Sequence, residues 1–228
     1  ADDITIDTLS GNGTITIASG FQFTNFVMGW TAVKTNILSL AGNISGAAWT
    51  AAGNSAINRV LIKSSVVGTP RTITISGAVS HGNVDYADIT ASGAGWATAT
   101  ATSTIGDALG NTGITVDASV QQTSTGTASF TWSTHGWTTR VPLPQDDVSV
   151  PNAFVAGRTI TADMPRLGRS IDLSGASGAP ALSVSAGLSI VCERTTEDSD
   201  EGGRRGYSAG YQPTQFSEAM GGLDLATT

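Results

Sequence analysis

The first 192 residues of this chain contain no glutamate and only two lysines, Lys34 and Lys63. All four glutamates lie beyond residue 192, and charged residues make up only 13% of the chain. Helical proteins normally place Glu and Lys on their solvent faces, so this shortage argues against a mainly helical body.

Three further absences narrow the class of protein. No apolar run approaches the roughly 18 residues of a membrane span. The net charge of −7 argues against a nucleic-acid partner, which requires a basic surface to neutralise phosphates. Cys192 is the only cysteine, so no intrachain disulfide can form and we expect a small buried residue or an incidental thiol.

The chain is rich in the residues of short strands and tight turns. It contains 28 glycines and 32 threonines, which favour turns and strands respectively. Apolar residues alternate in short pieces, such as Ile4 and Ile6 or Val60 and Ile62, with Gly, Asn, Ser and Pro between them. The pattern predicts an all-β fold.

The spacing of these pieces favours a right-handed parallel β-helix, or β-solenoid. Val148, Ile160, Ile171 and Leu182 follow one another at nearly equal steps along the chain. Strands at this spacing predict three-sided coils of about 22 to 36 residues per turn, which bury a narrow continuous core. A β-sandwich or jelly roll remains the alternative, because it also has a strand every ~8–12 residues.

An internal repeat supports the solenoid. The sequence RTIT at 71–74 recurs at 158–161, and Val-Asp at 84–85 matches Ile-Asp at 171–172 at the same offset. We predict that the apolar residues of these segments point inward in stacked coils: Ile73, Val84, Ile160 and Ile171.

Composition divides the chain into four segments. We expect a β-solenoid part at 1–128, a Trp- and Pro-rich connector at 129–147, further β coils at 148–192, and a charged C-terminal tail or interaction arm at 193–228. Within the first part, the Ala- and Thr-rich residues 92–104 predict a flat strand or an extended loop. Apolar residues of the tail are candidates for binding a neighbouring subunit: Tyr207, Tyr211, Phe216, Met220 and Leu223.

Three aspartates are the candidates for catalysis. Asp85 and Asp88 are three apart in one strand-like segment, so they are expected on opposite faces, and Asp107 could approach one of them in space. Paired carboxylates at about 5–9.5 Å would serve glycoside hydrolysis. The simpler interpretation is that these side chains accept hydrogen bonds from turn amides.

The remaining polar candidates suggest no cofactor. Asp146 and Asp147 could attract a hard cation, but the spaced acidic pattern of a calcium loop is missing, so capping of a strand start is favoured. His81 and His135 lie far apart in the sequence and have no Cys or Glu at ligand spacing, which predicts no zinc site.

Trp132 and Trp137 are candidates for glycan binding. They lie among Ser, Thr and Gly, and an exposed Trp ring can stack on a sugar. The alternative is burial, since Trp contributes a large packing area.

Five strand-and-turn phrases follow one another through the body: LSLAGNISGAAWTAAGN (38–54), RVLIKSSVVGTPRTITISG (59–77), NVDYADI (83–89), IGDALGNTGITV (105–116) and RVPLPQDDV (140–148). The stretch from about 36 to 190 resembles Gly- and Thr-rich β-structural, including β-helical, proteins of tailed bacteriophages and their prophages. The resemblance implies a role on a virion or a cell surface.

We therefore expect a non-enzymatic structural or adhesive component of a bacteriophage virion, such as a fibre, a spike or a capsid-associated protein. Its expected partners are other virion proteins or copies of itself, in a homo-oligomer, and a host surface glycan is a further candidate. The first alternative is a β-helix that cleaves or binds a surface polysaccharide. The second is a bacterial surface or secreted adhesin, or an ice-binding solenoid.

Overall fold

The computed structural model of the chain describes residues 2–6, 13–29, 34, 36–126, 128–150, 157–173 and 181–185. Two compact units, Ala1–Ala118 and Ser119–Thr228, are called here the first and the second unit. The described residues are all-β, and their stacked strands form a β-solenoid of about seven turns. Every pair of named strands is parallel, whereas a β-sandwich is built from antiparallel sheets, so the predicted solenoid is confirmed.

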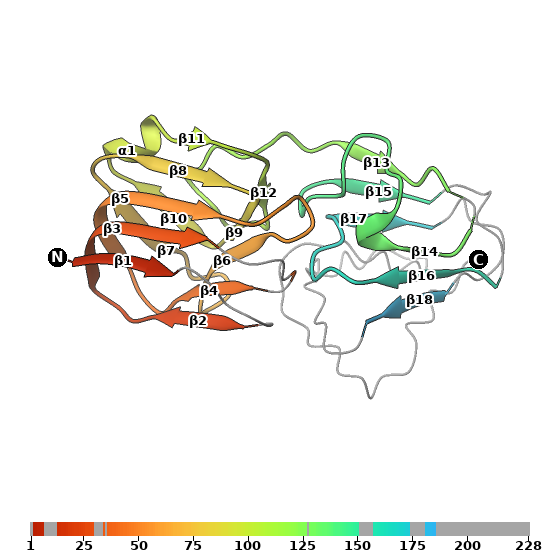
Figure 1. The fold of residues 1–228 in the computed structure, drawn as a ribbon, viewed down its shortest axis with the longest axis horizontal. Coiled ribbons are helices and arrows are strands. Elements are labelled where there is room, and N and C mark those ends of the chain that lie inside the picture. Colours follow the sequence, from red (N-terminus) through yellow and green to blue (C-terminus); the bar gives the residue numbers. More distant parts are fainter. Residues whose placement is uncertain are drawn as a thin grey trace, which may run out of the picture. The chain divides into compact units, whose positions relative to one another are not determined.

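The first unit contains two parallel sheets (Figure 1). Sheet A has seven strands: β1 (Asp2–Ile6), β3 (Phe21–Gly29), β5 (Ile44–Ala52), β7 (Arg71–Ile75), β8 (Val79–Gly82), β10 (Ile89–Ser92) and β11 (Thr100–Ala101). Sheet B has five strands: β2 (Thr14–Ile17), β4 (Ile37–Leu40), β6 (Val60–Ser64), β9 (Val84–Ala87) and β12 (Ile105–Asp107). The chain visits the two sheets in turn, so each passage forms one coil.

Strand register shows that the coils differ in length. Phe21 pairs with Ile44, and Ile44 pairs with Ile73, which is a longer step along the chain than the first. Ile73 then pairs with Ala91, which is the shortest of the three steps. Coil length varies because the segments between the paired strands differ in length.

The interior of the first unit is apolar and aromatic. Trp49 on β5 stacks on Phe26 of β3, with ring centroids 4.4 Å apart and an interplanar angle of 10°. Ile73 and Val84 are buried, as predicted. Each coil therefore buries its inward face against the coils above and below it, which links the stability of neighbouring coils.

The second unit repeats the arrangement with two three-stranded parallel sheets (Figure 1). One contains β13 (Gln121–Thr123), β15 (Asp147–Ser149) and β17 (Ser170–Asp172), and the other contains β14 (Phe130–Thr131), β16 (Thr159–Ala162) and β18 (Ala181–Val184). Ile160 on β16 is buried, as predicted, whereas Ile171 on β17 is only partly buried.

The units divide between Ala118 and Ser119, earlier than the boundary expected at residue 128. The segment 129–147, expected to be a connector, belongs to the second unit and contains β14 and a short 3-10 helix, η1 (Trp132–Thr134). A Pro-rich segment can thus supply part of a coil, because solenoid turns tolerate irregular backbone.

Within the described residues, the other helix is α1 (Ala94–Ala97), in the segment expected to be a flat strand or an extended loop. A side chain at Gly95 would meet the backbone, because a Cβ there would lie 2.3 Å from the Gly77 carbonyl oxygen. Neither helix is long and apolar enough to cross a membrane.

The tail expected at 193–228 lies outside the described residues. The same holds for Cys192 and for the five candidates for subunit binding, Tyr207, Tyr211, Phe216, Met220 and Leu223.

Candidate functional site

Asp85, the first candidate acid, is held in a buried ion pair. It lies on β9, and Nε of Arg59 donates to its Oδ1 at 2.8 Å. Arg59 is 2% exposed and Asp85 is fully buried. The same guanidinium donates to the Val84 carbonyl at 3.0 Å and, from Nη1, to the Thr104 hydroxyl at 2.6 Å. Arg59 therefore joins three segments that are remote in sequence, and Asp85 neutralises its charge.

Asp88 lies in a turn rather than on the strand of Asp85. Strand β9 ends at Ala87, and Asp88 has a φ of 54°, in the left-handed region. Its Oδ2 accepts the Gly68 amide at 2.9 Å. A Cβ at Gly110 would lie 2.1 Å from its Oδ1, so the backbone passes directly beside this carboxylate. The two aspartates were expected on one strand, and Asp88 instead lies in the turn between β9 and β10.

Asp107 stabilises the next turn at the end of β12. Its Oδ1 accepts the Leu109 amide at 2.9 Å and the Asn111 side-chain amide at 2.7 Å. Asn111 in turn donates to the Tyr86 carbonyl at 2.7 Å and accepts the Ile89 amide at 3.0 Å. Asp88 and Asp107 thus make the turn-amide hydrogen bonds of the simpler interpretation, and Asp85 is engaged by Arg59.

His81 belongs to a buried aromatic group of the first unit. Its Nδ1 lies 3.1 Å from the Tyr86 hydroxyl, and its ring meets Trp96 edge-on at 5.8 Å. Burial lowers the pKa of His81 to about 4 and raises the pKa of Tyr86. Both side chains are therefore neutral at pH 7, as the apolar surroundings require.

The depressed pKa of His81 predicts acid sensitivity of the first unit. As the pH falls from about 6.5 to 4, the unfolded chain takes up a proton that the folded chain resists, so stability decreases by up to about 3 kcal/mol. Below pH 4 both states are protonated and this contribution stops changing. Urea unfolding at pH 7 and pH 4.5 measures the loss.

The control for His81 is His81→Gln, which cannot titrate but can still bond Tyr86. Carboxylates titrate equally in both proteins, so the difference between the two pH profiles isolates His81. Identical profiles would show that His81 is already solvated in the folded protein.

Trp132 and Trp137 belong to an aromatic cluster of the second unit, made of Phe130, Trp132, His135 and Trp137. Trp132 is fully buried, and the two indole centroids are 4.7 Å apart. Trp137 is half-buried and donates from Nε1 to the Trp132 carbonyl at 3.1 Å. The ring of Trp132 is therefore inaccessible to a sugar. Of the two tryptophans, Trp137 is the one that could stack on a sugar ring.

A Ser–His pair in the same unit was missed by the sequence reasoning. The Ser124 Oγ lies 2.6 Å from the His135 Nε2, and His135 stacks on Phe130 with centroids 3.7 Å apart. Burial lowers the pKa of His135, so the imidazole is neutral at pH 7. Ser124 is only 2% exposed, so its hydroxyl is enclosed and the pair fastens the 124–126 segment to the segment around His135.

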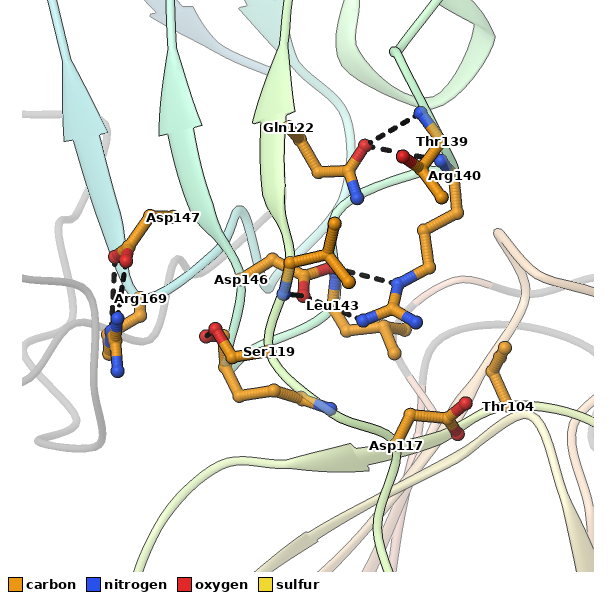
Figure 2. Close-up of polar contacts among 12 residues, drawn as sticks. Thr104, Asp117, Ser119, Gln122, Thr139, Arg140, Leu143, Asp146, Asp147 and Arg169 are labelled. Atoms are coloured by element: carbon orange, nitrogen blue, oxygen red, sulfur yellow. Dashed lines mark hydrogen bonds and ion pairs between the residues drawn. The ribbon is translucent and has the colours of Figure 1, made fainter.

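Asp146 is the centre of a buried hydrogen-bond network (Figure 2). Its Oδ1 accepts Arg140 Nη2 at 2.7 Å and the Val120 amide at 2.8 Å, and its Oδ2 accepts Arg140 Nε at 3.0 Å and the Leu143 amide at 2.9 Å. Gln122 accepts two further amides, those of Thr139 and Arg140, at 3.1 and 3.2 Å. Both oxygens of Asp146 are therefore occupied immediately before β15, which fits the favoured capping role.

Asp147 points to a different set of partners (Figure 2). Arg169 forms a two-bond ion pair with its carboxylate, and the Ser170 hydroxyl donates to Oδ1 at 2.6 Å. The hydrogen bond from Arg169 lowers the pKa of Asp147. The two adjacent acids thus have separate partners, and the described part of the chain contains no group of three or more His, Cys, Asp or Glu that could hold a metal.

Comparison of the chain with protein-family models, with curated proteins and with solved structures gives no match.

Proposed function

We propose that this chain is a non-enzymatic structural or adhesive component of a bacteriophage virion, such as a fibre, a spike or a capsid-associated protein. The observation that carries the proposal is the unbroken parallel stacking of the first unit, where β1, β3, β5, β7 and β10 follow one another in one sheet. Stacked coils make a stiff body with a long lateral surface for binding other virion proteins or copies of the chain.

The contacts of the candidate acids support a non-enzymatic role. A glycosidase needs one carboxylic acid and one carboxylate facing the substrate. Asp85 is buried against Arg59, and Asp88 and Asp107 accept hydrogen bonds from turn groups. These contacts give each of the three candidate carboxylates a structural partner within the first unit.

The proposal predicts that the protein is found in purified particles. Mass spectrometry of gradient-purified virions should detect its peptides at a constant ratio to the major capsid protein, and immunogold labelling should give its position. Recovery of the protein only in the particle-free lysate would contradict a virion role.

We also predict that the purified protein releases no reducing or unsaturated ends from host surface polysaccharide. A reducing-sugar assay and absorbance of unsaturated products would measure this directly. Release that is lost in Asp85→Asn, Asp88→Asn or Asp107→Asn would instead support the carbohydrate-active alternative, provided that each variant retains the β-rich circular dichroism of the wild type.

A second candidate function is glycan binding by the second unit. It is favoured by the half-buried ring of Trp137, which is followed by the exposed Thr138 and Thr139. Titration with host polysaccharide fragments should change the tryptophan fluorescence of the wild type and not that of Trp137→Ala. An unchanged response in Trp137→Ala would exclude this residue as the binding site.

A further inference from the structure

Two rings of the aromatic cluster in the second unit, those of His135 and Trp137, are half-buried and lie side by side. They meet edge-on, with ring centroids 5.0 Å apart and an interplanar angle of 84°. His135 stacks on Phe130, so Trp137 stands perpendicular to this stack. Aromatic rings that remain partly open to solvent are typical of the lining of small-ligand sites.

His135 uses only one of its ring nitrogens within the protein. Its Nε2 lies 2.6 Å from the Ser124 hydroxyl, whereas its Nδ1 has no hydrogen-bond partner among the described residues. Because the imidazole is neutral at pH 7, one nitrogen donates and the other accepts. A hydroxyl group can bond Nδ1 in either case, since a hydroxyl both donates and accepts.

The segments that carry these rings have no charged side chains. Residues 118–139 contain no Asp, Glu, Lys or Arg. Burial alone lowers the pKa of His135, and no neighbouring charge contributes to the change. The carboxylate of Asp163 accepts the amide and the hydroxyl of Ser133, at 2.9 and 2.5 Å. An anionic ligand would therefore meet a carboxylate near the cluster and no cation in residues 118–139.

Hydroxyl side chains follow the two rings along the chain. Thr134, Thr138 and Thr139 are exposed next to His135 and Trp137. The surface thus combines aromatic rings and hydroxyl groups without charge. A sugar ring has the complementary groups, because its faces carry CH groups and its edges carry hydroxyls.

We propose that Trp137 and His135 bind a neutral glycan, made of hexose or N-acetylhexosamine units without carboxylate, sulfate or phosphate groups. The negative face of the Trp137 indole attracts the CH groups of a sugar ring, and His135 Nδ1 bonds a sugar hydroxyl. The inference rests on the glycan-binding candidate proposed above. It adds the class of glycan and a second contact residue.

A printed glycan array tests the class of ligand. The array carries neutral hexose and N-acetylhexosamine oligosaccharides beside oligosaccharides that contain uronic acid, sulfate or phosphate. The labelled full-length chain should bind only neutral members. Binding to acidic members alone, or to both classes equally, would overturn the inference and leave glycan binding itself intact. If the chain binds no member, the glycan-binding candidate fails as well, and the virion role is still tested separately on purified particles.

Calorimetric titration with the neutral oligosaccharide that binds most strongly on the array tests the two residues. Trp137→Ala should weaken binding about tenfold or more, and Trp137→Phe should retain most of it because an aromatic face remains. His135→Phe preserves an aromatic ring against Phe130 but removes Nδ1, and should weaken binding by about threefold to tenfold, the usual effect of one hydrogen bond.

The matched control for His135 is Ser124→Ala, which breaks the same internal bond to Nε2 and leaves Nδ1 in place. It should bind the oligosaccharide like the wild type, and all variants should keep the β-rich circular dichroism of the wild type. Equal weakening in His135→Phe and Ser124→Ala would show that His135 only positions the cluster, which would overturn its role as a contact residue. Wild-type affinity in Trp137→Ala would overturn the site.

Discussion

Replacing Arg59 with methionine should lower the free energy of unfolding of the first unit by about 3–5 kcal/mol, the usual result of removing one partner of a buried ion pair. Asp85 is fully buried, so the variant removes the guanidinium that pairs with this carboxylate in an interior of low polarity. The carbonyl of Val84 and the hydroxyl of Thr104 also lose their bonds to the guanidinium. Urea unfolding followed by circular dichroism measures the change.

Two comparisons make the Arg59 result specific. Arg59→Met combined with Asp85→Leu should recover most of the loss, because an apolar pair of similar volume avoids the uncompensated charge. Arg169→Met removes an ion pair of the second unit whose Arg is 47% exposed, and should lower stability by no more than about 1 kcal/mol. Equal losses in Arg59→Met and Arg169→Met would mean that the Arg59 pair is solvated.

Replacing Ile160 with aspartate should prevent folding of the second unit. Ile160 is buried on β16, where it pairs with Phe130 of β14 and Leu182 of β18. An unpaired charge at this position faces a penalty of at least several kcal/mol, a large part of the stability of a typical domain. The near-ultraviolet circular dichroism of Trp132 and Trp137 should be lost.

The control at this position is Ile160→Val, which should lower the free energy of unfolding by only about 0.5–1.5 kcal/mol. A soluble Ile160→Asp protein that melts at the temperature of the wild type would show that the side chain does not point inward. In that case the strand register of the second unit would need to be shifted by one residue.

The alternation of apolar residues within a single strand predicts well which of its side chains are buried. Ile73, Val84 and Ile160 were predicted to point inward, and all three are buried. The prediction succeeds because side chains alternate with a period of two along any strand, whatever its partners. Ile171 is only partly buried, and it lies on β17, the last strand in the order β13, β15, β17.

Alternation along the sequence does not predict the positions of side chains in or near turns. Asp88 follows Tyr86 at an even spacing from the buried Val84, yet its positive φ takes it out of the strand. The polar neighbours of Trp132 in the sequence suggest an exposed ring, yet this side chain is fully buried. The residues next to a side chain in the sequence show only the local polarity. Its burial depends on segments distant in the sequence that pack against it.

The sequence by itself determined the fold class of this protein. Its body has no Glu and few Lys for the solvent-facing positions of helices, and its short Thr-rich alternations between glycines favour short strands. Only the tertiary structure decided which strands lie side by side and what each polar side chain contacts. Arg59 and Asp85 come from different coils, which the pairing of β6 with β9 brings together. Coil length is set by the turns, and sequence alternation carries no information about which turn returns a strand to which neighbour.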